Sequence, residues 1–429
     1  MKCSPTSGTR SVIAAMLSRS RSLFCRCALL TLALVGAAAA PSAAAEPPYA
    51  EVLRHKLLEE LTAEQVPGAL VYVNDPNLGI WKASLGSADL SGTPIDINSH
   101  MRIGSVTKTI AAVAVLLAVD NGLIALDAPI ARYLHHTVPG GGHITVRQLL
   151  NHTAGLFNNT EDDNLNVALD ANPFQIFTPL QSLAIAFAHK PYFKFGKEAC
   201  NDITKAPCWH YSNTNYIVLG MLLEEVTGRA VADIFRDWIF SPLGMTETSL
   251  PDIQDNAIPQ PHPRGYLFGT NVQSNNAYKA AISGDVEGSK INVPRGAPPN
   301  DATDWNPAYT WTSGSVISTL SDMAVWAKAL ATGVLLKPQT YAEQLHWAPR
   351  STYGLGISEV MPGFVGHNGA IPGFQTVVSY SRDDGATIIV LTNSEVVPNR
   401  PLGAALPAEN LAEMIRQTLF PIGDSQQRK

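Results

Sequence analysis

Residues 103–119 read IGSVTKTIAAVAVLLAV, and this stretch decides the fold. From position 109 onward nearly every residue is Ala, Val, Ile or Leu, which predicts a helix buried around most of its circumference. Ser105 stands just before that helix, and Lys108 follows three residues later on the same face. The N–H groups and the dipole at a helix N-terminus stabilise nearby negative charge. The stretch therefore predicts a nucleophilic serine with a lysine beside it.

The usefulness of Lys108 depends on its surroundings. A serine hydroxyl is a poor nucleophile at neutral pH and needs an adjacent base. A lysine one turn into an apolar helix is expected to be partly desolvated, which lowers its pKa toward that of a useful base. The pattern Ser-x-x-Lys also arises by chance, so on this motif alone Lys108 is more often an ordinary solvated charge, and the apolar flanking run changes that balance.

Two further polar motifs follow along the chain. Tyr211-Ser212-Asn213 precedes a predicted helix at 217–227, and His367-Asn368-Gly369 precedes predicted strands at 373–380 and 387–392. A tyrosine near a cation loses its proton more easily, and an asparagine both donates and accepts hydrogen bonds. The glycine permits close approach of a ligand to a strand, and the histidine has variable charge. Taken singly, each motif is more often structural.

The order of the three motifs is the stronger signal. Ser105-x-x-Lys108, then Tyr211-x-Asn213, then His367-x-Gly369 resemble the signature motifs of the serine β-lactamase and penicillin-binding-protein superfamily. The resemblance extends through Leu149–Leu156, which reads LLNHTAGL, and covers nearly the whole chain after residue 45. It implies an α/β (α+β) fold in which helices flank an antiparallel sheet, plus an all-helical domain, with the site in the cleft between them.

Within this superfamily the tyrosine motif is similar to that of class C β-lactamases, soluble D-alanyl-D-alanine carboxypeptidases and related esterases. Class C enzymes usually carry Lys-Thr-Gly where this chain has His367-Asn368-Gly369, and the chain contains no Lys-[Thr/Ser]-Gly. The departure argues against efficient β-lactam hydrolysis. It makes the carboxypeptidase and esterase branch the nearest resemblance.

The resemblance also implies a role for each site residue. Ser105 is expected to be acylated after Tyr211, ionised beside Lys108, removes its proton, although the identity of the base stays open in such a coupled pair. The other implied roles are substrate orientation by Asn213, substrate contact and proton return by His367, close approach at Gly369, and oxyanion binding by the backbone N–H groups of Ser105 and Ala370. His152 is interpreted as a structural group. No metal and no organic cofactor are expected.

Three functions compete on this evidence. The first is a D-alanyl-D-alanine carboxypeptidase-like or β-lactamase-related hydrolase acting on cell-wall peptides. The second is an esterase or amidase that uses the same groups on other small acyl compounds. The third is a catalytically silent binding protein with the same fold. The expected partner is a small-molecule or peptide substrate in all three.

The chain suggests a sheet assembled from both of its ends. Helices and strands are predicted near each terminus, and mostly helices lie between them. We expect an α/β domain from residues 46–135 and 310–420, and a mainly helical insertion at 136–309. Within the insertion, residues 262–309 are rich in Gly, Pro, Asn, Asp and Ser, which predicts a long surface loop.

The N-terminus carries the pattern of a secretory signal. Arg19, Arg21 and Arg26 precede an apolar run at 27–40, and small residues follow up to Ala45, which predicts a signal peptide at 1–45. The protein is then expected to be exported, periplasmic or secreted, with no stable membrane span after cleavage. Loss of the segment's five basic residues moves the formal charge from -6 to about -11, which makes nucleic acid an unfavourable partner.

Two cysteines remain after such a cleavage. Cys200 and Cys208 are close in sequence, and in an exported chain this favours a disulfide that closes a short loop. The alternative is a pair of buried thiols. A zinc site is disfavoured because His210 is the one obvious nearby ligand.

Overall fold

The computed structural model describes residues 45–196, 208–294, 296–349 and 351–421. The predicted signal peptide lies outside these residues except for Ala45. Cys208 is buried, but Cys200 also lies outside the described residues, so the disulfide stays a prediction. The fold described below belongs to the unit Glu46–Lys429.

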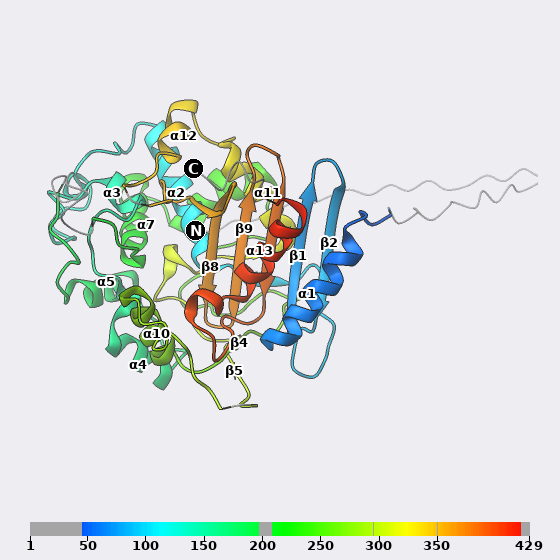
Figure 1. Cartoon of the computed structure of the whole chain (residues 1–429). Helices are drawn as coiled ribbons and strands as arrows, with labels where there is room; N and C mark the ends of the chain where they lie inside the picture. The colour runs from blue at the N-terminus through cyan, green and yellow to red at the C-terminus, as the bar shows by residue number, and fades with distance from the viewer. Residues whose placement is uncertain (1–44, 197–207, 295, 350, 422–429) are drawn as a thin grey trace, which may run out of the picture. The chain divides into compact units, whose positions relative to one another are not determined.

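A six-stranded antiparallel sheet is built from both ends of this unit (Figure 1). The strand order is β2-β1-β10-β9-β8-β7, so two N-terminal strands join four C-terminal ones. The strands are β1 (Gly68–Asp75), β2 (Gly79–Gly86), β7 (Ser358–Met361), β8 (Phe364–Ile371), β9 (Phe374–Tyr380) and β10 (Thr387–Thr392). Short pairs are formed by β3 (His100–Arg102) with β6 (Ile317–Thr319), and by β4 (Tyr266–Leu267) with β5 (Asn300–Asp301).

Helices make up most of the remaining structure. Figure 1 shows α3, α4, α5, α7 and α10 gathered beside the sheet. The α-helices are α1 (Ala50–Glu64), α2 (Thr107–Asp120), α3 (Val146–Leu150), α4 (Asp163–Ala171), α5 (Pro179–Phe187), α7 (Asn213–Thr227), α8 (Val231–Phe235), α9 (Ser241–Leu243), α10 (Asn271–Ser283), α11 (Leu320–Thr332), α12 (Pro338–Gln344) and α13 (Pro407–Leu419).

The alternation of side-chain direction along the central strands explains how helices cover both faces of the sheet. Successive strand residues point to opposite faces. On β1, Val71 and Val73 pack in a cluster with α1 and α13, whereas Leu70 packs in a second cluster with α2 and α11. Figure 1 shows α1 and α13 lying against one side of the sheet. The sheet is therefore a middle layer between helices, as the predicted fold class requires.

Several predicted elements agree with the structure. The strands expected at 373–380 and 387–392 are β9 and β10, which pair antiparallel from Gln375 with Thr392 to Tyr380 with Thr387. The fold class is confirmed. The boundaries 46–135, 136–309 and 310–420 proposed for the domains stay a prediction.

The predicted loop at 262–309 was wrong in one part, because it contains the 13-residue helix α10. Thr270 and Gln273 form a capping box at its start, and the Asp170 carboxylate accepts from the backbone N–H groups of Asn271 (2.7 Å) and Val272 (3.0 Å). The helix ends at Gly284, whose φ is 82°. Caps and tertiary contacts thus stabilise a segment whose apolar residues show little helical periodicity.

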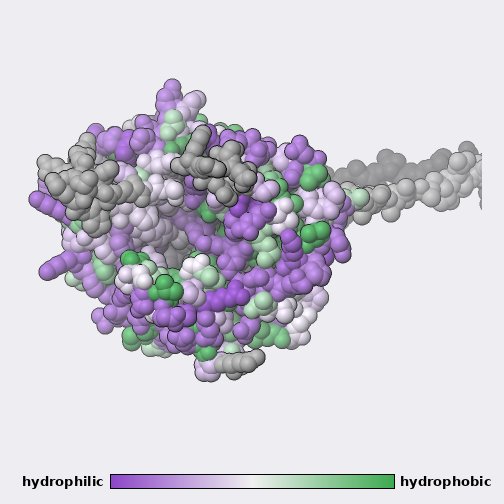
Figure 2. All heavy atoms as spheres, viewed as in Figure 1, coloured by the Kyte–Doolittle hydropathy of each residue, from purple (hydrophilic) through white to green (hydrophobic). Residues whose placement is uncertain are grey.

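Among the described residues, no helix combines the length and the hydropathy that a membrane span requires. Figure 2 shows one face of the molecule, where hydrophilic residues cover most of the surface and hydrophobic ones form separate spots. That face therefore has no broad hydrophobic area.

Candidate active site

Ser105 lies in a short 3-10 turn, η1 (Gly104–Val106), directly before α2. Lys108 is in the first turn of α2 and is fully buried. The Lys108 Nζ and the Ser105 Oγ are 2.9 Å apart. The turn and the helix thus bring the predicted nucleophile and lysine into hydrogen-bond contact.

The surroundings of Lys108 favour a neutral amine. Its Nζ donates to the Asn213 Oδ1 at 2.6 Å and to the Ser313 backbone carbonyl at 2.7 Å. Burial lowers the pKa of Lys108 well below its usual range, and no described carboxylate forms an ion pair with it. A neutral amine has two N–H groups and one lone pair. The Lys108 Nζ donates to the Ser105 Oγ in the structure, and in the neutral form, with both N–H groups given to carbonyl oxygens, its lone pair can instead accept the Ser105 proton.

Tyr211 is the third member of this group. The Lys108 Nζ lies 4.8 Å from the centre of the Tyr211 ring. Burial, followed by the neighbouring Tyr353, raises the pKa of Tyr211 well above its usual range. This differs from the expectation that Tyr211 is ionised beside Lys108. Burial disfavours both charged forms, and it therefore favours a neutral amine and a neutral phenol in the resting pair.

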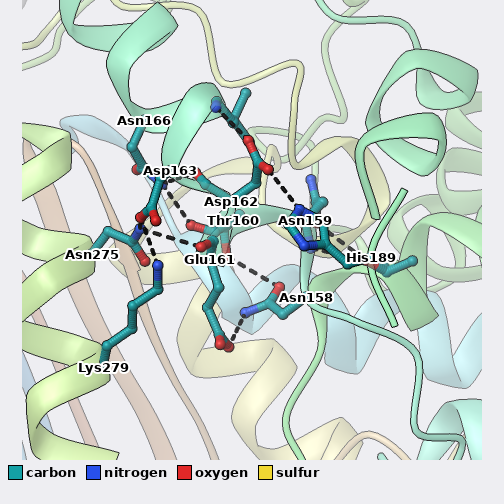
Figure 3. Close-up of polar contacts among 12 residues, drawn as sticks. Asn158, Asn159, Thr160, Glu161, Asp162, Asp163, Asn166, His189, Asn275 and Lys279 are labelled. Carbon is teal, nitrogen blue, oxygen red and sulfur yellow. Dashed lines mark hydrogen bonds and ion pairs between the residues drawn. The ribbon is translucent and has the colours of Figure 1, made fainter. Parts of the chain in front are cut away.

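Asn213 connects the tyrosine motif to a polar segment that the sequence did not single out. Its Nδ2 donates to the Thr160 Oγ1 at 2.9 Å, and its backbone N–H donates to the Asn158 Oδ1 at 3.0 Å. Asn158 in turn donates from Nδ2 to the Glu161 Oε1 at 3.1 Å (Figure 3). The amide oxygen of Asn213 is therefore held in place to accept from Lys108.

His152 lies behind the tyrosine motif. It is fully buried, and its Nδ1 accepts from the Ser212 backbone N–H at 3.1 Å and from the Asn215 Nδ2 at 3.2 Å. Its ring centre is 4.4 Å from that of Tyr211. Burial lowers the pKa of His152 well below its usual range, so the ring is neutral. This position agrees with the prediction that His152 is a structural group, because its ring packs against that of Tyr211.

His367 is on β8 but does not line the pocket described below. Its side chain is 2% exposed, its Nε2 accepts from the Tyr353 hydroxyl at 2.9 Å, and its Nδ1 donates to the Asn368 backbone carbonyl. Burial, followed by Lys108, lowers the pKa of His367 to about 3. The structure therefore brings His367 near the site as a neutral group, without the expected access to substrate.

We predict that His367→Ala lowers kcat about 100-fold, because the Tyr353 hydroxyl loses its acceptor and the strand beside Ser105 loses its support. Steady-state kinetics across pH 5–9 measure the effect. A histidine that stays neutral leaves the shape of the pH profile unchanged. Disappearance of an acidic limb in the variant would instead show that His367 carries a proton during the reaction.

Two glycines allow β8 to meet the Ser105 turn. A Cβ at Gly369 would lie 2.1 Å from the Ile103 carbonyl oxygen and 2.8 Å from the Ser105 nitrogen, both backbone atoms. Gly104 has φ +52°, and a Cβ there would lie 2.8 Å from the Ala370 nitrogen. The backbone N–H groups of Ser105 and Ala370 are thus brought to one junction, which we call the β8 seam.

Gly369→Ala is predicted to open the β8 seam, because neither backbone neighbour can rotate away. We expect a loss of about 1–3 kcal/mol in the free energy of unfolding and of about 100-fold in kcat, the typical cost of one oxyanion donor. Chemical denaturation and single-turnover kinetics measure the two effects. Gly142→Ala is the control, since a Cβ at Gly142 meets nothing within 4 Å. Equal behaviour of the two variants would contradict the prediction.

A cavity of about 430 Å³ opens beside these groups. Its lining includes Ser105, Tyr211 and Asn213 together with Gly369 and Ala370 of β8. The ionisable lining residues, apart from tyrosines, are all acidic: Glu161, Glu395 and Glu409. No described Lys, Arg or His side chain lines the cavity.

The acidic side of the cavity is braced by contacts between α4 and α10. The Asp163 carboxylate accepts from the Lys279 Nζ at 2.6 Å and from the Asn275 Nδ2 at 3.1 Å (Figure 3). Asn275 also donates to the Glu161 backbone carbonyl at 3.3 Å. These contacts attach α10 to the segment that carries Glu161. No group of three or more described His, Cys, Asp or Glu residues is arranged to hold a metal ion.

Comparison with known proteins defines the class to which this fold and site belong. Residues 54–411 match the family described as Beta-lactamase, and the chain belongs to this family. It is an enzyme, a hydrolase with the fold of serine β-lactamases and penicillin-binding proteins.

Individual relatives differ in the activity that their names state. PbpX of Bacillus subtilis (strain 168), which bears the name of a penicillin-binding protein, is 27% identical over 302 residues, 70% of this chain and 63% of PbpX. The esterase EstB of Burkholderia gladioli is 28% identical over 246 residues, 52% of this chain and 59% of the esterase. Both alignments span about three fifths of the relative's own length.

A solved structure covers more of the chain. A D-stereospecific amidohydrolase from Streptomyces is 27% identical and superposes with a TM-score of 0.69, covering 87% of this chain and 99% of the amidohydrolase. The family is therefore established, and it contains proteins named for penicillin binding, ester hydrolysis and amide hydrolysis.

Proposed function

We propose that this enzyme hydrolyses amide or ester bonds of small substrates that have no carboxylate next to the scissile bond, through an acyl-enzyme on Ser105. The observation that carries the proposal is the 2.9 Å contact between Ser105 and a buried lysine, in a cavity whose ionisable wall is acidic. The names of the esterase and amidohydrolase relatives support the same reaction class.

In the proposed acylation, the neutral Lys108 amine takes the Ser105 proton while Oγ bonds to the substrate carbonyl carbon. The backbone N–H groups of Ser105 and Ala370 hold the oxyanion that forms. As the bond to the leaving group breaks, Tyr211 donates its proton to that group. Tyr211 then regains a proton from the Lys108 ammonium, which restores the neutral pair. A raised tyrosine pKa and a lowered lysine pKa both suit this direction of transfer.

Water completes the cycle by the same groups. A water molecule attacks the acyl carbonyl and gives its proton to the amine and phenol pair, and the Ser105 oxygen leaves with a proton from Lys108. Asn213 accepts a hydrogen bond from Lys108 at 2.6 Å, and it also lines the cavity.

The charge of the cavity favours this function over a D-alanyl-D-alanine carboxypeptidase. A C-terminal dipeptide and a penicillin both carry a carboxylate near the bond that is cleaved. A carboxylate next to the reacting bond is well stabilised by a cationic side chain. The cavity lining has no Lys, Arg or His to pair with such a group, and its ionisable side chains apart from tyrosines are carboxyl groups. The carboxypeptidase hypothesis is therefore second.

A matched substrate panel separates the two functions. We expect the purified enzyme to hydrolyse the methyl ester and the C-terminal amide of N-acetyl-D-alanyl-D-alanine faster than the free dipeptide acid, and to turn over penicillin slowly. Each kcat/KM is compared with that of Ser105→Ala to subtract background hydrolysis. Preference for the free acid would contradict the proposal and return the carboxypeptidase hypothesis to first place.

A further inference from the structure

Glu395 lies in the wall of the cavity, and one of its carboxyl oxygens lacks a partner among the described residues. It follows the buried strand β10, and its Oε2 is buried without a hydrogen-bond partner among the described residues. Burial raises the pKa of Glu395 to about 8, and no neighbouring donor opposes that effect. Buried polar groups are almost always hydrogen-bonded, so an unpaired carboxyl at a cavity wall calls for an explanation.

Three other carboxyl groups among the described residues each accept a hydrogen bond from a side chain. Glu161 accepts from the Asn158 Nδ2 at 3.1 Å, and Glu409 accepts from the Asn368 Nδ2. Away from the cavity, Glu64 accepts from the Arg400 Nη1 at 2.8 Å and from the Asn410 Nδ2 at 2.6 Å. The Glu64 Oε2 is also buried without a partner, so Glu395 differs from these three in having no side-chain donor on either oxygen among the described residues.

A second acceptor at the cavity also lacks a donor. Asn275 is 6% exposed, and its Nδ2 donates to the Glu161 carbonyl and to Asp163. Its Oδ1 is buried without a hydrogen-bond partner among the described residues. Both Asn275 and Glu395 line the cavity, and the lining has no Lys, Arg or His to satisfy them. The described lining side chains provide no cation for these two acceptors, and an ammonium group of a ligand would supply one.

The wall that carries Glu395 is a packed one. Val396, the next residue, is buried in a small hydrophobic cluster with Ala277 of α10 and with Ile291. The Glu395 backbone N–H donates to the Tyr266 carbonyl at 3.1 Å. The backbone that carries the carboxyl group is thus held by packing and by a hydrogen bond, which suits a group that binds a ligand.

We infer that Glu395 binds a primary ammonium group on the substrate, so that the enzyme selects acyl donors with a free amine, such as amides or esters of amino acids. The inference rests on the proposed function, since it names the substrate class of the same cavity. The raised pKa keeps Glu395 protonated in the empty cavity, and the charge of a bound ammonium favours the carboxylate. An ammonium offers three donors, enough for that carboxylate and a further acceptor such as the Asn275 Oδ1. Charge-assisted hydrogen bonds of this kind are stronger than neutral ones.

Two substrates that differ in the amine alone test the inference. They are alanine 4-nitroanilide, used as both enantiomers, and propionic acid 4-nitroanilide. We expect the wild type to prefer the better alanine enantiomer by at least about 10-fold in kcat/KM, and Glu395→Gln to lose about 10- to 100-fold on it, in line with a charged hydrogen bond. The same variant should change the propionyl substrate less than about threefold.

The control is Glu225→Gln, which removes an exposed carboxyl from α7 outside the cavity lining. It should leave both substrates unchanged, because a distant surface charge is screened by salt. Equal losses of Glu395→Gln on the two substrates, or a wild type without preference for the amine, would overturn the inference and leave the proposed function intact.

A binding measurement keeps the test independent of turnover. In a Ser105→Ala background, calorimetry compares alaninamide with propionamide, and the amine should strengthen binding about 10-fold or more. Adding Glu395→Gln should abolish that difference. Amine-dependent binding without any hydrolysis by the wild type would refute the proposed function while supporting the recognition by Glu395. Equal binding of the two amides would refute the recognition itself.

Discussion

Ser105→Ala is expected to abolish covalent labelling by a fluorophosphonate ester and to lower kcat/KM for a 4-nitrophenyl ester by about 1,000-fold or more. The reason is that the hydroxyl, its base and the oxyanion donors act as one unit, so that loss of one member removes most of the catalysis. Ser105 is half-buried at the cavity wall, and removing one oxygen there leaves no large void. Intact-mass analysis and peptide mapping locate the adduct, and steady-state kinetics measure the rate.

The matched control for this variant is Ser321→Ala, which changes an exposed serine in the first turn of α11. Both variants should unfold at the wild-type temperature, while the control alone keeps wild-type activity. An adduct on another residue, or an undiminished esterase rate in Ser105→Ala, would show that the nucleophile lies elsewhere.

Lys108→Met is expected to lower kcat/KM by a comparable factor, about 1,000-fold. Methionine keeps most of the buried volume, but it cannot take the Ser105 proton. It also leaves the Asn213 Oδ1 and the Ser313 carbonyl without the donor that contacts them at 2.6 Å and 2.7 Å. Lys108→Arg should not restore activity, because a guanidinium stays protonated at any working pH. Lys328→Met, which alters an exposed lysine on α11, is the control.

The pH profile of the wild type tests the same residue without a mutation. A base is active when it is unprotonated, so kcat/KM should rise with pH through the pKa of Lys108 and then level off. Because burial lowers that pKa well below its usual range, the plateau should be reached far below the value of about 10.4 for a free lysine. Activity that continues to rise up to pH 10 would show that the lysine is not desolvated in the working enzyme.

The sequence predicted best those elements in which the residue types themselves indicate burial. An apolar run such as 109–119 can be buried only as a helix or a strand of the core, and its length favours a helix. Ser105, Lys108, Tyr211 and Asn213 could be grouped because the order of their motifs matched a known family. The helix α10 escaped prediction because Asp170, which is far from it in sequence, holds its N-terminus.

The remaining features of the site depend on long-range contacts that no local pattern records. The Ser313 backbone carbonyl accepts a hydrogen bond from Lys108, and a backbone contact of this kind cannot be predicted from the residue type. The Glu395 Oε2 lacks a partner among the described residues, and this can be recognised only when the positions of all the cavity residues are known. The neutral state of Tyr211 follows from burial, whereas the sequence showed a nearby cation and therefore suggested ionisation.

The β8 seam has a consequence for the order in which activity arises during synthesis. The Ser105 turn is synthesised long before the strand that abuts it. In the strand order, β8 reaches β1 through β9 and β10, so a chain that stops short of Thr392 lacks the sheet that holds β8 in place. A growing or prematurely terminated chain of this kind contains serine, lysine and tyrosine without the β8 seam, and we expect it to be inactive until β8, β9 and β10 have been made.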